Sequence, residues 1–142
     1  LKRLSEVPNI VAVKECNLNQ VAQTRLLCGD DLIIYSGEDG NVVPLMALGG
    51  KGVISVAANV IPADMHKMVQ SFLKGDLEES QKMQINMINL VNALFCEVNP
   101  IPVKAAMNEM GMNVGKCRMP LVDISEKGLN TVRAALSEYG LL

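Results

Sequence analysis

The sequence predicts an α/β protein, and two patterns carry this prediction. In the first half of the chain, three short runs of β-branched and aliphatic residues, at positions 10–14, 32–36 and 53–56, each precede a helical pattern. After Gly75 the patterns are helical only. Because strands that alternate with helices are typical of parallel βαβ units, we expect a parallel sheet followed by a helical region.

The helices of the first half are expected over residues 20–27, 41–48 and 62–73. Pro62 at the start of the third and Gly75 beyond its end fit the usual helix boundaries. This third helix also has the strongest helical period, because its apolar side chains recur at i, i+3, i+4 and i+7: Met65, Met68, Val69 and Phe72.

The second half predicts three more helices. One long amphipathic helix is expected over residues 76–95, opened by a D-x-x-E capping pattern that ends at Glu79. Another begins after Asn99, which precedes a proline, and ends at Gly111. A last helix follows Ser125, and its predicted apolar face is Leu129, Val132, Leu136 and Tyr139.

Three parallel strands make a poor independent sheet, because both outer edges would be unpaired and a parallel sheet needs both faces covered. An eight-stranded (β/α)8 barrel would supply the missing neighbours and would place functional groups at the C-terminal ends of the strands. We therefore predict a barrel portion over residues 1–75 and a helical domain over residues 76–142. The chain starts at Leu1 rather than Met, and we expect it to be a piece of a longer protein.

Composition excludes several classes of function. With 49% hydrophobic and 20% charged residues, the chain resembles an ordinary globular domain. A net charge of −2 with scattered Lys and Arg gives no basic surface for nucleic acid. No apolar run is long enough to span a bilayer, and the N-terminus lacks a secretory signal, so we expect a cytoplasmic protein with a small-molecule partner.

Potential metal ligands are scattered along the chain. His66 is the one histidine and has no second histidine to pair with, so a surface position is expected. The four cysteines have no C-x-x-C spacing, which indicates neither a zinc site nor a disulfide framework: Cys16, Cys28, Cys96 and Cys117. The sequence predicts no metal and no cofactor.

Lys14 is the main candidate for chemistry, because it places an ammonium at the end of the first apolar strand. In a barrel, Lys14 would face the mouth beside Gly37 and Ile54, at the ends of the next two strands. Two interpretations stay open. In the first, the side chain extends to water or pairs with Glu15 or Glu38.

In the second interpretation, Lys14 is a nucleophilic amine. Burial can lower a lysine pKa from about 10.4 to roughly 7 to 8, which frees a lone pair to attack a ketone. The resulting iminium withdraws electrons, so an adjacent methyl group can lose a proton and become an enamine nucleophile. This is the chemistry of an aldolase.

Two glycine-rich stretches are candidates for ligand-binding loops. The loop at residues 36–40 either lets an anion approach its backbone and the following helix, or is a tight turn capped by Asp39. Residues 49–52 precede a strand rather than follow one, so we interpret them as a helix stop and not as a phosphate loop.

With these stretches in order, the chain resembles the pyruvate-dependent class I aldolases, and most closely the C-terminal half of the dihydrodipicolinate synthase family. "VAVKE" (11–15), "YSGEDG" (35–40) and "GGKGVISVAANVIP" (49–62) are similar to sequences shared with N-acetylneuraminate lyase and the keto-deoxy-sugar aldolases. "NPIPVK" (99–104) and "CRMPL" (117–121) are similar to the synthase branch. The resemblance covers essentially the whole chain.

This resemblance implies the last three strands of a (β/α)8 barrel, a C-terminal helical domain and assembly as a homotetramer. It implies a Schiff-base-forming lyase in which pyruvate condenses on Lys14. The enamine would attack aspartate-β-semialdehyde to give 4-hydroxy-tetrahydrodipicolinate, on the route to diaminopimelate and lysine. Gly37 would line the site, and the backbone of Ile54 would contact pyruvate.

By the same resemblance, the proton-relay tyrosines, the threonine pair for the pyruvate carboxylate, the semialdehyde-binding arginine and the lysine feedback site belong to the missing N-terminal half. Tyr35 and Tyr139 do not fall at the relay positions. We therefore expect an incomplete catalytic apparatus and an isolated chain that is inactive or nearly so. The alternatives are a sibling aldolase acting on sialic acid or a keto-deoxy acid, and a non-catalytic half-barrel that serves as an assembly module.

Overall fold

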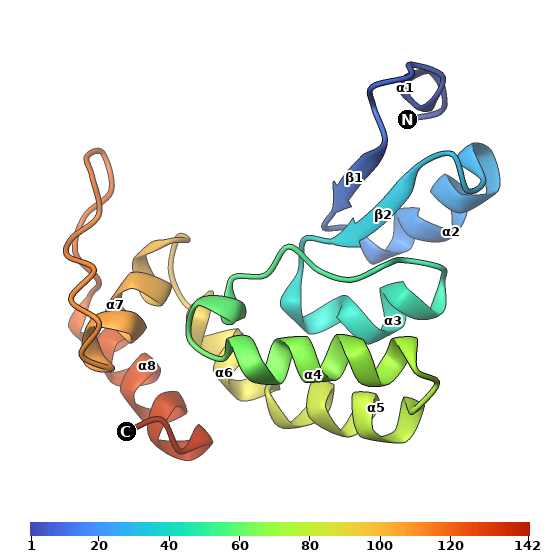
Figure 1. The fold of residues 1–142 in the computed structure, drawn as a ribbon. Coiled ribbons are helices and arrows are strands. Elements are labelled where there is room, and N and C mark those ends of the chain that lie inside the picture. Colours follow the sequence, from blue (N-terminus) through green and yellow to red (C-terminus); the bar gives the residue numbers. More distant parts are fainter. The chain divides into compact units, whose positions relative to one another are not determined.

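The computed structural model describes all of residues 1–142, which form two compact units (Figure 1). Unit 1 comprises Leu1–Ser55 and Lys67–Gln84, and unit 2 comprises Val56–His66 and Ile85–Leu142. Two helices, α4 (Pro62–Leu73) and α5 (Leu77–Asn86), give residues to both units. Each unit is described by itself.

Unit 1 confirms the α/β prediction. The elements that it contains besides parts of α4 and α5 are α1 (Lys2–Ser5), β1 (Ala12–Glu15), α2 (Leu18–Cys28), β2 (Ile33–Ser36), the short 3₁₀ turn η1 (Asp39–Asn41) and α3 (Val42–Ala47). The two strands are parallel, with Ala12 opposite Ile33 and Lys14 opposite Tyr35. Both strands are shorter at their N-terminal ends than the sequence pattern predicts.

The third predicted strand, residues 53–56, is largely wrong. Only Val53 pairs, through an isolated parallel bridge to Ser36. The backbone that precedes it does run beside β2, because Lys51 N donates to Ile34 O at 2.9 Å and Ser36 N donates to Gly52 O at 2.8 Å. From Ala57 the chain turns into the 3₁₀ segment η2 (Ala57–Asn59), so the extended conformation ends earlier than the apolar run does.

The core of unit 1 lies on one face of this small sheet. Ile34 packs with Val21 of α2 and Leu45 of α3, and Val13 of β1 lies against the same cluster. Figure 1 shows α2 and α3 together beside the two strands. Because side chains alternate along a strand, the residues between these core positions point to the opposite face, where Ala12, Lys14 and Ile33 are exposed.

Helices α4 and α5 are tied to each other within unit 1. Ser80 is fully buried and donates from Oγ to Met68 O at 2.9 Å, and Lys67 pairs with Glu79 at 2.6 Å. The predicted cap of α5 is half formed, since Asp76 Oδ1 accepts from Glu79 N while the Glu79 carboxylate binds Lys67 instead. The bounds of α4 confirm the prediction for residues 62–73.

Unit 2 is helical and contains α6 (Ile88–Leu94), α7 (Ile101–Glu109) and α8 (Glu126–Tyr139). The single helix predicted over residues 76–95 is wrong, because it is divided into α5 and α6 at Met87, which has φ −87° and ψ −3°. The Met87 backbone leaves the regular α-helical conformation, although Met87 O still accepts from Val91 N at 2.9 Å and the Met87 side chain stays fully buried. The apolar period continues through the break, so the sequence gives no sign of it.

The last helix, α8, is held at both ends. Its N-cap Ser125 accepts from Gly128 N at 3.0 Å, and Arg133 forms a two-point ion pair with Glu109 of α7. At the other end, Tyr139 donates to Asp64 Oδ2 at 2.8 Å. Burial, followed by this contact with a carboxylate, raises the pKa of Tyr139 to about 12. No helix in the structure combines the length and the hydropathy that crossing a membrane requires.

Candidate active site

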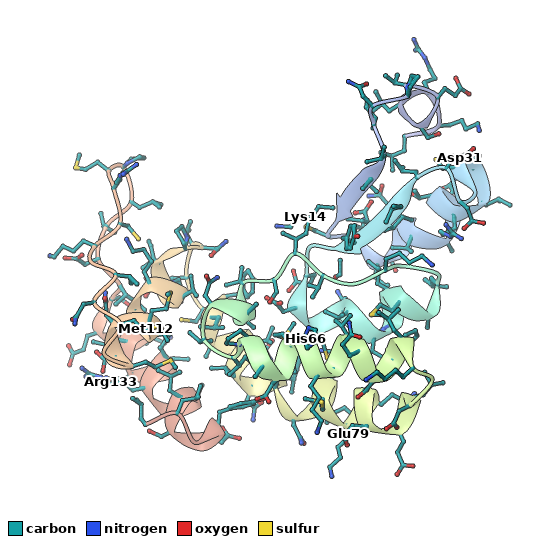
Figure 2. The ribbon with its side chains drawn as sticks, in the orientation of Figure 1. Lys14, Asp31, His66, Glu79, Met112 and Arg133 are labelled. Carbon is teal, nitrogen blue, oxygen red and sulfur yellow. The ribbon has the colours of Figure 1, made fainter.

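Lys14 lies near the C-terminal end of β1, on the face of the sheet opposite the core. Its register partner Tyr35 lies on that same face, while the neighbouring Val13 packs toward α2 and α3. Figure 2 shows the Lys14 side chain projecting from the end of the strand, away from α2. The amine therefore stands where a barrel would place its catalytic groups.

Two backbone hydrogen bonds bring the three predicted site residues to one edge of unit 1. Gly37 N donates to the carbonyl of Glu15, the residue after Lys14, at 2.8 Å. Ile54 N donates to the carbonyl of Ser36, the residue before Gly37, also at 2.8 Å. Because the paired segments are parallel, Lys14, Gly37 and Ile54 stand side by side at their C-terminal ends.

Gly37 provides the space in which the Lys14 side chain lies. A Cβ at position 37 would come 2.7 Å from Lys14 Cε and 2.9 Å from Lys14 Cγ. Both distances are far shorter than a normal contact between carbon atoms. The aliphatic part of Lys14 thus crosses the surface that glycine leaves open, and any larger residue at this position would displace it.

Cys16 is a neighbour of Lys14 that the sequence analysis did not identify. Its Sγ is even closer than Lys14 to the position that a Cβ of Gly37 would occupy. The thiol is free and exposed. A signal was present, since Cys16 follows Lys14 by two residues and side chains at i and i+2 of an extended segment share a face.

The alternative in which Lys14 pairs with Glu15 is not formed. Glu15 points to the opposite face of the strand, and its Oε1 accepts from Asn17 N at 2.7 Å. The ion pairs of Arg25, Lys67, Lys116 and Arg133 do not involve Lys14 or Glu15.

The loop after β2 is ordered by its own hydrogen bonds. Ser36 Oγ donates to Glu38 O at 2.7 Å and accepts from Glu38 N at 3.2 Å. Asp39 is buried inside η1 and does not occupy the N-cap position of α3, which is Asn41. The tight turn is therefore present, but Asp39 does not form the predicted cap.

The second glycine-rich stretch confirms its interpretation as a helix stop. Gly49 follows α3 with φ +94°, a left-handed conformation that favours glycine, and its N–H donates to Met46 O at 2.9 Å.

The remaining candidates belong to unit 2. His66 is exposed on α4, and no group of three His, Cys, Asp or Glu side chains is arranged to hold a metal ion. Unit 2 contains a pocket of about 330 Å³ between α7, α8 and the segment that joins them. Its charged side chains have partners: Lys104 donates to the main-chain O of Lys116, Lys116 pairs with Asp123, and Glu109 pairs with Arg133.

The chain is similar to one family along nearly its whole length. A model of the dihydrodipicolinate synthetase family matches residues 1–139. The 4-hydroxy-tetrahydrodipicolinate synthase of Acetivibrio thermocellus is 57% identical over 142 residues, which are 100% of this chain and 49% of that protein.

Solved structures agree with this similarity. Dihydrodipicolinate synthase from Thermotoga maritima superposes with a TM-score of 0.94 at 39% identity, over 99% of this chain and 50% of that one. The chloride-inhibited enzyme from Acinetobacter baumannii, complexed with pyruvate, gives a TM-score of 0.93 at 35% identity, over 99% and 49%. The chain thus spans about half the length of the relatives that it matches.

Proposed function

Because the chain belongs to the dihydrodipicolinate synthetase family, we propose that it is the half of a 4-hydroxy-tetrahydrodipicolinate synthase that carries the Schiff-base lysine. The observation that carries this proposal is the position of Lys14, at the C-terminal end of a parallel strand with its side chain lying across Gly37. The relatives named after this activity and the pyruvate complex of one of them support the same substrate.

In the proposed mechanism, the lone pair of Lys14 Nζ attacks the ketone carbon of pyruvate. Loss of water from the resulting carbinolamine gives an iminium, which draws electrons from the methyl carbon. That carbon loses a proton and becomes an enamine. The enamine then forms a carbon–carbon bond to the aldehyde of aspartate-β-semialdehyde. The amino group of the second substrate finally attacks the iminium carbon, closes the ring and releases Lys14.

The main chain of Ile54 can contact pyruvate through only one of its two polar groups. Its N–H already donates to Ser36 O, so a contact with bound pyruvate falls to the carbonyl oxygen of Ile54. A carbonyl can accept a hydrogen bond from the carbinolamine hydroxyl but cannot bind the pyruvate carboxylate. Recognition of that carboxylate therefore does not fall to Ile54.

The rest of the enzyme is proposed to complete the site. The preceding half of a (β/α)8 barrel would pair with the free edge of β1 and cover the exposed face around Ile33. It would also supply the proton relay and the groups that bind the two carboxylates. In this proposal residues 1–75 are the last portion of the barrel, residues 76–142 are the helical domain, and the whole enzyme is a cytoplasmic homotetramer.

Borohydride trapping tests the proposed function. This chain would be joined to the amino-terminal half of the A. thermocellus relative, and the resulting joined protein would be incubated with pyruvate, reduced and mapped by mass spectrometry. We expect one modified lysine, Lys14, and no label in Lys14→Arg. Lys51, which is exposed on the adjacent segment, is an internal control that should stay unmodified. An unlabelled Lys14 in the active joined protein would contradict the proposal.

A further inference from the structure

Gln84 is a buried polar residue far in sequence from the candidate site. It lies on α5 with 8% of its surface exposed. Its Nε2 donates to Asp39 O at 2.9 Å, and its Oε1 accepts from Val43 N at 3.1 Å. Both partners belong to the connection between β2 and α3, so this one amide ties α5 to the loop that follows β2.

The two hydrogen bonds of Gln84 satisfy main-chain groups at the start of α3 and in the loop before it. The first N–H groups of a helix have no partner within the helix, and Asn41 at the N-cap of α3 makes no side-chain hydrogen bond to them. Gln84 supplies an acceptor to Val43 from outside. Only a side chain with both a donor and an acceptor can bind the carbonyl of Asp39 and the N–H of Val43 at the same time.

The same loop carries Gly37, against which Lys14 lies. Its backbone is fixed on the strand side by the contacts of Ser36 with Glu38, and on the helix side by Gln84. Gly37 lies between Ser36 and Glu38, two residues before Asp39, so a shift of Asp39 would be passed along the main chain to the surface that supports the Lys14 side chain. Gln84 is thus connected to the amine by a short series of contacts, although it does not touch it.

We propose that Gln84 is a positioning residue for Lys14: by holding Asp39 O and Val43 N, it sets the place of Gly37 and hence the direction from which the amine meets a ketone. This inference rests on the proposed function of Lys14. It concerns the main chain of the loop and needs no contact between Gln84 and substrate.

Two variants of the joined protein test the proposal. Gln84→Met keeps the approximate length of the side chain and removes both hydrogen bonds. Gln84→Glu keeps the volume and the acceptor for Val43 but loses the donor to Asp39 O. Should Gln84→Met fail to fold, Gln84→Glu carries the same test.

Ser80→Ala is the matched control. Ser80 lies one turn before Gln84 on the same helix, is also buried, and also makes a side-chain hydrogen bond to a main-chain carbonyl. Its partner Met68 belongs to α4 and not to the loop. The control therefore loses a buried hydrogen bond of the same kind without changing the support of Gly37.

The first measurement is the rate at which the imine at Lys14 forms, trapped with borohydride at a series of pyruvate concentrations. The second is the thermal unfolding temperature of each variant. We expect both Gln84 variants to lower the maximal rate by about ten- to a hundredfold, the range for a reacting group misplaced by up to about 1 Å. Ser80→Ala should lower the unfolding temperature and leave the maximal rate unchanged.

The outcomes separate this inference from the proposed function. If the parent labels at Lys14 and the Gln84 variants label at the same maximal rate, Gln84 is only a structural residue and the inference is wrong. A fall in rate for Ser80→Ala equal to that for Gln84→Met would also overturn it, because the effect would then follow stability alone. If the parent itself does not label, the proposed function fails and this inference fails with it.

Discussion

At the scale of single residues, the position of the Lys14 side chain depends on Gly37, which leaves open the space where that side chain lies. The glycine is not required for a turn, because it does not have a positive φ, but for the space that the lysine occupies. Its main-chain N–H still donates to Glu15 O, and this bond does not depend on the side chain. Substitution here is therefore expected to disturb the amine more than the fold.

Gly37→Ala tests this relation in the joined protein. The added methyl would meet Lys14 Cε and Cγ, so we expect imine formation with pyruvate to slow by about tenfold or more. Gly75→Ala is a suitable control, since nothing lies within 4 Å of its Cβ position and its φ of +85° makes the change destabilising. A normal trapping rate in Gly37→Ala would show that Lys14 does not need this space.

Cys16 gives a second prediction at this scale. Alkylation of its exposed thiol with iodoacetamide adds a group beside Gly37, in the volume where Lys14 lies. We expect the alkylated joined protein to form the imine about tenfold more slowly. Cys16→Ala should keep the parent rate and become insensitive to the reagent. Equal inhibition of this variant would place the sensitive cysteine elsewhere.

Elements were predictable from the sequence where one local rule decided them. The period of Met65 and Met68 fixes α4, and the N-cap at Ser125 fixes the start of α8. The break at Met87 has no local signal, because neither glycine nor proline is present and the apolar period continues through it. The β-branched residues at positions 53–56 likewise do not show that the only bridge of this segment is the one at Val53.

The residues of the candidate site were likewise predictable from the sequence only in part. Lys14, Gly37 and Ile54 could be brought together from the sequence, because parallel strands place their C-terminal ends at one edge. Gln84 could not be found in this way, since its partners are more than forty residues away and its own helix gives no reason for a buried amide.

The contact between α8 and α4 gives a prediction for elements. The folded-state pKa of Tyr139 is raised to about 12 from an ordinary 10.0, so the contact stabilises the fold fully below pH 10 and loses this contribution as the pH rises towards 12. Tyr139→Phe should remove this alkaline loss, and its stability should stay level between pH 10 and 12. Unfolding in urea across this pH range, with phenolate absorbance recorded in parallel, measures both. An unchanged alkaline loss in the variant would assign it to another group.

At the scale of the whole molecule, one face of the two-stranded sheet is exposed. Ile33 is 37% exposed and Ile54 is 50% exposed, while β1 pairs only on the side of β2. Apolar side chains and an unpaired strand edge together favour association. A partner polypeptide that adds strands at this edge is the natural way to remove both features.

The chain alone is therefore expected to self-associate and to turn over substrates about 10² to 10⁴ times more slowly than the joined protein, because it lacks a positioned proton shuttle. Adding the amino-terminal half of the A. thermocellus relative as a separate polypeptide should restore Lys14 labelling and reduce light scattering. Full turnover by the chain alone would refute the expectation.

The alternation along β1 has a consequence for how this gene can vary. Val13 faces the core and Lys14 faces away from it, so a one-residue insertion immediately before Val13 would turn each of them to the other face. The amine would then enter the apolar cluster of Val21 and Leu45, and a valine would stand at the reactive edge. Length changes are thus forbidden within this strand even where single substitutions are tolerated, whereas the exposed turn at Gly29–Asp30 can absorb them.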